Sequence, residues 1–153
     1  MNERSSVARG RGRSERGTAL LETALTLPLL LLVSVSIFEF GRAYQTWQIL
    51  TNAAREGARV AVLPNPASGS VQARVQQYMV SGQLPNAASA TVSVNRNATI
   101  SLGAGTATAS QVTVNYPFQF IVLQPVARLI VANSTLGTPL TMTASALMRN
   151  ESQ

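Results

Sequence analysis

Acid–base chemistry in this chain would have to use glutamate, because histidine, lysine, aspartate and cysteine are all absent. The six carboxylates are spread along the sequence, at Glu3, Glu15, Glu22, Glu39, Glu56 and Glu151. No two of them are placed to converge in one pocket, and a hydroxyl nucleophile without histidine or lysine lacks its usual base. The missing histidine and cysteine also remove most zinc, haem and iron–sulfur ligands. We therefore predict that the protein is not an enzyme and that it holds no cofactor and no metal.

One of these glutamates, Glu22, is the single charged residue between Thr18 and Phe38. These 21 residues would form a helix of about 31 Å, close to the hydrocarbon thickness of a bilayer. A carboxylate inside such a helix costs on the order of 2 to 3 kcal/mol unless a cation pairs with it. If it lies near the interface instead, the positive end of the helix favours it. Both interpretations stay open, and a free amine on a neighbouring subunit would serve as the cation.

The leader in front of this segment is densely basic. Residues 1–17 hold five arginines and two glutamates, a net charge of +3, and the apolar run follows at once. This order predicts a transmembrane helix over residues 18–40 with its N-terminus in the cytoplasm. A cleaved secretory signal would need small residues after the apolar core, but Glu39-Phe40-Gly41-Arg42 stands there. A nucleic-acid-binding leader is disfavoured because it lacks interleaved aromatic residues and adjoins the membrane helix.

Two motifs carry a family resemblance. Gly17 followed by Thr-Ala-Leu-Leu-Glu22 and an apolar run resembles the processing site of type IV prepilins. The longer string from Arg16 to Pro28, followed by four leucines, is similar to the opening of TadE-like proteins, and residues 53–59, AAREGAR, resemble their second characteristic patch. The strings VTVNYPF at 112–118 and ASALMR at 144–149 fit the usual ending of such domains.

The resemblance implies a minor pseudopilin of the tight-adherence (Tad, or Flp pilus) secretion machinery, which helps to assemble, initiate or anchor an adhesive pilus. A prepilin peptidase would cut between Gly17 and Thr18 and leave Glu22 as the fifth residue of the mature chain. Related pilins often carry an aromatic residue after this glutamate, whereas Thr23 follows here. The implied partners are the bacterial inner membrane, other pilin or pseudopilin subunits, the peptidase and the Tad machinery, with no nucleic acid. The Thr18 amine of one subunit would then pair with Glu22 of its neighbour.

Residues 41–63 predict an amphipathic stalk helix that continues the membrane helix. Its apolar positions, which recur at helical spacing, are Ala43, Trp47, Leu50, Ala54, Ala58 and Ala61. Glu56 and Arg59 are three residues apart and can pair. Gly57 is costly in a helix, which indicates close approach by another segment, either this chain's own sheet or a partner subunit. The residues expected to act in assembly are Glu22, Pro28, Ala54, Arg55, Glu56, Gly57 and Arg59.

Residues 64–153 predict an exported α+β domain. A helix is expected over 70–81, with Ser68 or Ser70 as its N-cap. Alternating patterns predict antiparallel strands covered on one face by the stalk, at Thr91–Asn95, Thr99–Leu102, Val112–Tyr116 and Leu140–Met148, with a turn at Gly103–Gly105. The apolar stretch 117–132 predicts burial in the domain and a short helix over 125–132; a contact surface for a partner or the membrane is the second interpretation.

The predicted fold class is therefore α+β, pilin-like, with a long transmembrane-plus-stalk helix packed on a small antiparallel sheet. The predicted location is the bacterial inner membrane, which the chain would cross once, with its N-terminus cytoplasmic and its C-terminal domain periplasmic or extracellular. The alternative is an uncleaved single-pass envelope protein whose exported domain binds a partner without building a filament. Cleavage after Gly17 separates the two.

Overall fold

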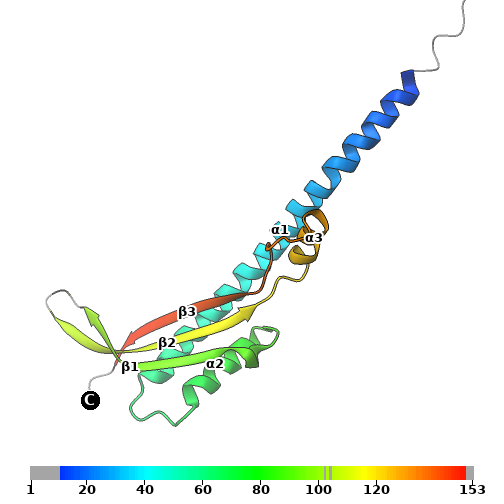
Figure 1. The fold of residues 1–153 in the computed structure, drawn as a ribbon. Helices are drawn as coiled ribbons and strands as arrows, with labels where there is room; N and C mark the ends of the chain where they lie inside the picture. The colour runs from blue at the N-terminus through cyan, green and yellow to red at the C-terminus, as the bar shows by residue number, and fades with distance from the viewer. Residues whose placement is uncertain (1–10, 102, 104, 151–153) are drawn as a thin grey trace, which may run out of the picture.

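One helix dominates the computed structural model, which describes residues 11–101, 103 and 105–150. Most of the leader, together with Leu102 and Ala104 of the expected strand and turn, lies outside the described residues. Helix α1 runs from Arg11 to Ala61, 51 residues, or about 76 Å at 1.5 Å per residue. It continues through Pro28 and extends far beyond the rest of the molecule (Figure 1). The expected membrane and stalk helices are thus one continuous element.

The remaining elements form a small α+β unit at the C-terminal end of α1, and the predicted fold class is confirmed. They are α2 (Ser70–Ser81), η1 (Ala87–Ser89), β1 (Thr91–Ser101), β2 (Thr106–Phe118), α3 (Leu123–Ile130) and β3 (Leu140–Arg149). The three strands form one antiparallel sheet in the order β1-β2-β3. The expected short strands at 91–95 and 99–102 are one strand, β1, because an irregularity between Asn95 and Ala98 shifts the register without ending the pairing.

Two helix boundaries differ from the sequence prediction. The N-cap of α2 is Gly69, in a left-handed conformation with φ 79°, and no side chain caps the helix; the prediction of a serine cap was wrong. Helix α3 begins two residues before Pro125, because the first-turn amides of a helix have no carbonyl partner within it and proline is tolerated there.

The sheet is covered on one face by helices and left open on the other (Figure 1). Alternate residues of β2 face α1 and are buried: Val112, Val114, Tyr116 and Phe118. The opposite face is exposed to solvent and carries hydroxyl and amide side chains. There the Thr143 hydroxyl donates a hydrogen bond to Oδ1 of Asn115 over 2.7 Å. The alternation predicted from the sequence therefore sets which face packs on α1.

The core lies where the last third of α1 meets α2 and β2. Leu50, Ala54 and Ala58 of α1 are completely buried, as are Val75 and Met79 of α2. Small residues on α1 let these elements approach closely, so the C-terminal part of α1 belongs to the core of the domain.

Candidate functional site

The N-terminal motif lies on the part of α1 that the domain leaves uncovered. An 18-residue window of this region has a mean hydropathy of 2.1, and none of it is buried. The helix is therefore long and apolar enough to cross a membrane, which is consistent with single-pass anchoring. Gly17, Thr18 and Glu22 are all exposed here, and a side chain added at Gly17 would meet nothing within 4 Å.

The hydroxyl groups in this half of α1 bond to the helix itself. Thr23, Thr26, Ser34 and Ser36 each donate to the carbonyl four residues earlier, over 2.7–3.0 Å. Such bonds satisfy a polar side chain without water, which a helix in hydrocarbon requires. Glu22 is the one ionisable side chain of this apolar segment.

The Glu22 carboxylate is open to contact from outside the chain. It is exposed, and none of the ion pairs within the described part of the chain involves it. Four residues later Thr26 bonds to its backbone carbonyl rather than to its side chain. An external cation could therefore reach the carboxylate without breaking an ion pair among the described residues.

The end of the apolar segment is fixed to the domain by Glu39, which is fully buried. Its Oε1 accepts hydrogen bonds from the backbone amides of Ile121 (2.8 Å) and Val122 (2.7 Å), directly before α3. Its Oε2 accepts from Arg42 at 2.9 Å. Charge-assisted bonds of this kind are about twice as strong as neutral ones. Glu39 thus locks the start of α3 onto α1.

Arg42 completes this junction. Its guanidinium also donates to the carbonyl of Gln119 and stands 4.6 Å from the centroid of the Phe118 ring, a cation–π contact. Phe118 and Phe40 each pack edge-on against Phe120, which joins the core to the exposed side of α1. Sequence reasoning placed Glu39 and Arg42 only at the membrane border. A glutamate followed three residues later by arginine was the available signal, but their partners are some eighty residues away.

The small residues of the second motif pack against this chain's own domain. Ala54 and Ala58 are fully buried, and a Cβ added to Gly57 would lie 2.5 Å from Val75 Cγ2 and 3.2 Å from Val112 Cγ1. This arrangement fits the first of the two interpretations of Gly57, close approach by the chain's own elements.

The charged residues of the same motif lie on the other side of α1. Glu56 pairs with Arg59 at 3.6 Å, as the spacing predicted, but its closer partner is Arg74 of α2, whose Nη2 lies 2.6 Å from Oε1. The hydrogen bond from Arg74 lowers the pKa of Glu56, although the cost of partial burial opposes this effect. Arg55 and Arg59 are exposed. The motif therefore divides into a buried half and a solvent-facing half.

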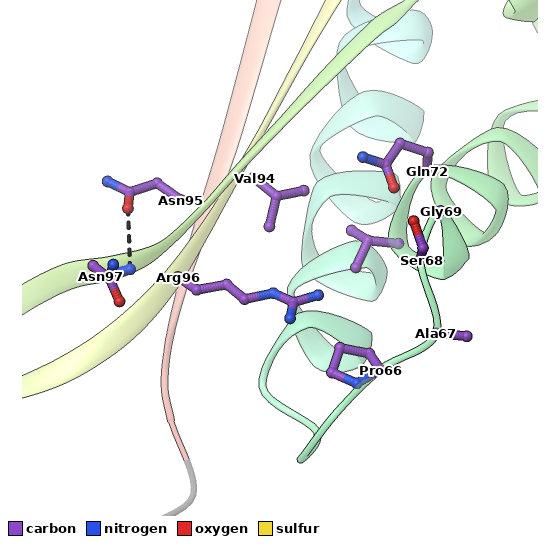
Figure 2. A pocket seen from close by; sticks show the side chains of 10 residues that line it. Pro66, Ala67, Ser68, Gly69, Gln72, Val94, Asn95, Arg96 and Asn97 are labelled. Carbon is purple, nitrogen blue, oxygen red and sulfur yellow. Dashed lines mark hydrogen bonds between the residues drawn. The ribbon is translucent and has the colours of Figure 1, made fainter.

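A groove of about 600 Å³ lies at the other end of the domain, between the loop before α2 and the irregular part of β1. Figure 2 shows the Arg96 side chain reaching across it toward Pro66 and the start of α2. Asn95 accepts a hydrogen bond from the backbone amide of Asn97 over 3.0 Å, which shapes the irregularity. Arg96 is the one charged side chain among the residues that line the groove, and no carboxylate or base accompanies it there.

The family comparison concerns the long helix. Residues 17–59 match the family model described as TadE-like protein. No curated protein and no solved structure matches the chain. The matched range includes Glu22, the Glu39–Arg42 junction and the AAREGAR patch, and all of it lies in α1. The segment from Gly17 to Arg59 is therefore similar to TadE-like proteins, the family that its two motifs resemble.

Proposed function

We propose that this chain is a membrane-anchored minor pseudopilin that takes part in assembling an adhesive Tad/Flp-type pilus or secretion apparatus. The supporting observation is that the TadE-like match covers the very helix that stands uncovered from Gly17 to Phe38 with a lone exposed carboxylate. In this proposal the protein lies in a bacterial inner membrane, with its leader in the cytoplasm and its domain exported. It acts by packing with other subunits and not by catalysis.

The proposed mechanism begins with cleavage between Gly17 and Thr18 by a prepilin peptidase. Both residues are exposed, so a protease could reach the bond once the helix frays locally. Cleavage creates a charged amine at Thr18, four residues before Glu22. In a bilayer an unpaired carboxylate costs on the order of 2 to 3 kcal/mol, so pairing between the amine of one subunit and Glu22 of the next is favoured.

Apolar contact would accompany this pairing. Leu29, Leu30 and Val33 are exposed on the same half of α1 and could pack against the helices of neighbouring subunits. The small residues Ala54 and Gly57 pack inside this chain's own domain. Contacts between the stalk and other subunits would therefore be made by exposed residues, among them Arg55 and Arg59.

The first test is Glu22→Ala in the native host, with Glu15→Ala as the matched control on the same helix. Both glutamates are exposed, but Glu15 lies in the leader that cleavage would remove. We expect Glu22→Ala to insert into the membrane normally and to be lost from isolated pili, while Glu15→Ala is incorporated as well as the unaltered chain. Immunoblots of membranes and sheared pili measure both quantities. Normal incorporation of Glu22→Ala would refute the pairing.

The second test is the intact mass and N-terminal sequence of the protein extracted from membranes. An N-terminus at Thr18 is the expected result, and Gly17→Leu should retain the leader because the bulky side chain obstructs the cleavage site. A retained leader in the unaltered chain would contradict processing. The protein would then be a permanent anchor.

A further inference from the structure

The end of the domain nearest the uncovered half of α1 carries a group of exposed apolar side chains. They belong to α3, to the segments on either side of it and to α1 itself: Phe40, Ile121, Leu129, Val131 and Leu136. We call this group the α3 patch. Figure 1 shows α3 and the loop before β3 beside α1, at the point where the helix leaves the domain. Leu129 is 87% exposed, on a helix whose other side, at Leu123 and Ala127, is buried.

The position of the α3 patch along α1 is fixed by contacts. The amides of Ile121 and Val122 lie within 2.8 Å of the Glu39 carboxylate, one residue beyond the end of the apolar segment at Phe38. Phe40 packs edge-on against Phe120, with 6.5 Å between ring centroids. The loop is held as well, because Gly137 lies so close to Gln124 that an added Cβ would be 2.7 Å from its backbone nitrogen. The patch is thus tied to one level of α1.

This level coincides with a bilayer surface if Thr18 to Phe38 spans the hydrocarbon. The interfacial layer on each side of a bilayer is about 5 to 7 Å thick, and one residue of helix rises about 1.5 Å. Residues anchored at Glu39 therefore lie within that layer.

The charge of the segment also suits a lipid surface. Between Phe120 and Leu140 the only charged residue is Arg128, which is exposed on α3 next to Leu129. An arginine beside apolar side chains can bind lipid phosphate while its neighbours enter the acyl boundary. A water-facing helix would normally carry several charges on its open side.

We propose that the α3 patch is a second membrane contact, in which α3 lies in the outer-leaflet interface beside the transmembrane part of α1. The inference rests on the membrane span that the proposed function requires. The occupant of the patch is lipid, at the headgroup–acyl boundary, with Arg128 toward the phosphates. Two contacts on one rigid unit would fix the tilt of the domain on the membrane, which a single helix alone would leave free.

Site-specific probes test this directly, because the chain has no cysteine. The full chain, reconstituted in vesicles of phosphatidylethanolamine and phosphatidylglycerol, is labelled with an environment-sensitive fluorophore at Leu129→Cys. Leu30→Cys reports the membrane span and Ser93→Cys, exposed on β1, reports bulk water. We expect blue-shifted emission and quenching by lipid-attached quenchers at positions 129 and 30. Only the probe at position 93 should be quenched by iodide.

Each other outcome has a defined meaning. If position 30 reports lipid and position 129 reports water, the membrane contact of α3 is refuted while the span remains. If position 30 also reports water, the span and the proposed function fail together. If position 129 is shielded from both quenchers only at high protein-to-lipid ratio, the patch is an interface between protein copies and the lipid proposal is wrong.

A charge substitution supplies a second readout. Leu129→Glu should abolish lipid quenching of a probe at Val131→Cys without changing the thermal unfolding of the domain, because Leu129 makes little contact with the core. Leu147→Glu, on the open face of the sheet, should leave both quantities unchanged. Lipid quenching at position 131 that survives Leu129→Glu would contradict the proposal.

Discussion

The two halves of α1 have similar leucine and alanine side chains but opposite surroundings. Leu30, in the first half, is 62% exposed, whereas Leu50, in the second, is completely buried under α2 and the sheet. From Thr18 to Phe38 the only charged residue is Glu22 and apolar residues lie on every side of the helix, whereas the second half is apolar on one side and polar on the other. A helix that is apolar all round needs a nonpolar solvent, whereas an amphipathic one needs only a domain to pack against. The second half packs on protein, and the first half is consistent with a membrane anchor.

The largest difference in stability should appear when one leucine in each half of α1 is replaced by alanine. Leu50→Ala should destabilise the domain by about 2 to 5 kcal/mol, because it removes a buried side chain and leaves a cavity. Leu30→Ala should not alter the unfolding of the domain, since no part of the domain covers that position. Thermal unfolding of the detergent-solubilised chain measures both. Equal effects would mean that the division of α1 is wrong.

The contacts that join the two halves of α1 to α3 can be removed at Glu39. Glu39→Ala removes the acceptor for two backbone amides and the partner of Arg42, at a cost of about 1.5 to 3 kcal/mol for a charged hydrogen-bonding group. Glu39→Gln retains one oxygen acceptor and should cost less. Hydrogen exchange at the amides of Ile121 and Val122 should accelerate most in the alanine variant. Unchanged exchange there would show that Glu39 does not hold α3.

Two glycines of α1 test the difference in packing between a covered and an uncovered position of the helix. Gly57→Ala should destabilise the domain by about 1 to 3 kcal/mol from overpacking, because its Cβ would meet Val75 and Val112. Gly41→Ala meets nothing within 4 Å and should gain up to about 1 kcal/mol from helix propensity. Urea unfolding of both variants tests the sign of each effect. A stabilising Gly57→Ala would disprove close packing at that point.

The smallest effect concerns the solvent-facing pair of Glu56 and Arg74. Glu56→Gln should cost less than about 1 kcal/mol at neutral pH, because the pair is partly exposed. The lowered pKa of Glu56 means that its stabilisation is complete above the ordinary glutamate pKa of about 4.3 and is lost as the pH falls through the folded-state value. The unaltered chain and Glu56→Gln should therefore converge in acid. Arg59→Gln, which breaks only the 3.6 Å contact, should have a smaller effect at every pH.

The sequence predicted what depends on local periodicity. The helix over 70–81 was predicted from its apolar spacing and local end signals and the pairing of Glu56 with Arg59 from spacing, and both agree with the structure. The contacts of Glu39 with Ile121 and Arg74 with Glu56 could not be predicted, because they join residues that only the tertiary fold brings together. The serine cap failed for a related reason: Gly69 has a positive φ, which the loop geometry sets and residue preference alone does not reveal.

Because α1 is continuous, it fixes the direction in which Glu22 points relative to the domain. Glu22 and Phe40 are 18 residues apart, about five full turns at 3.6 residues per turn, so they face the same side of the helix axis. Trp47, 25 residues from Glu22, lies within about 20° of that direction. Deleting one residue between Glu22 and Glu39 would rotate the carboxylate by about 100° relative to the domain. The apolar residues between Glu22 and Glu39 can be exchanged for other apolar residues, but their number cannot change by one without turning Glu22 away from the side on which Phe40 and Trp47 lie.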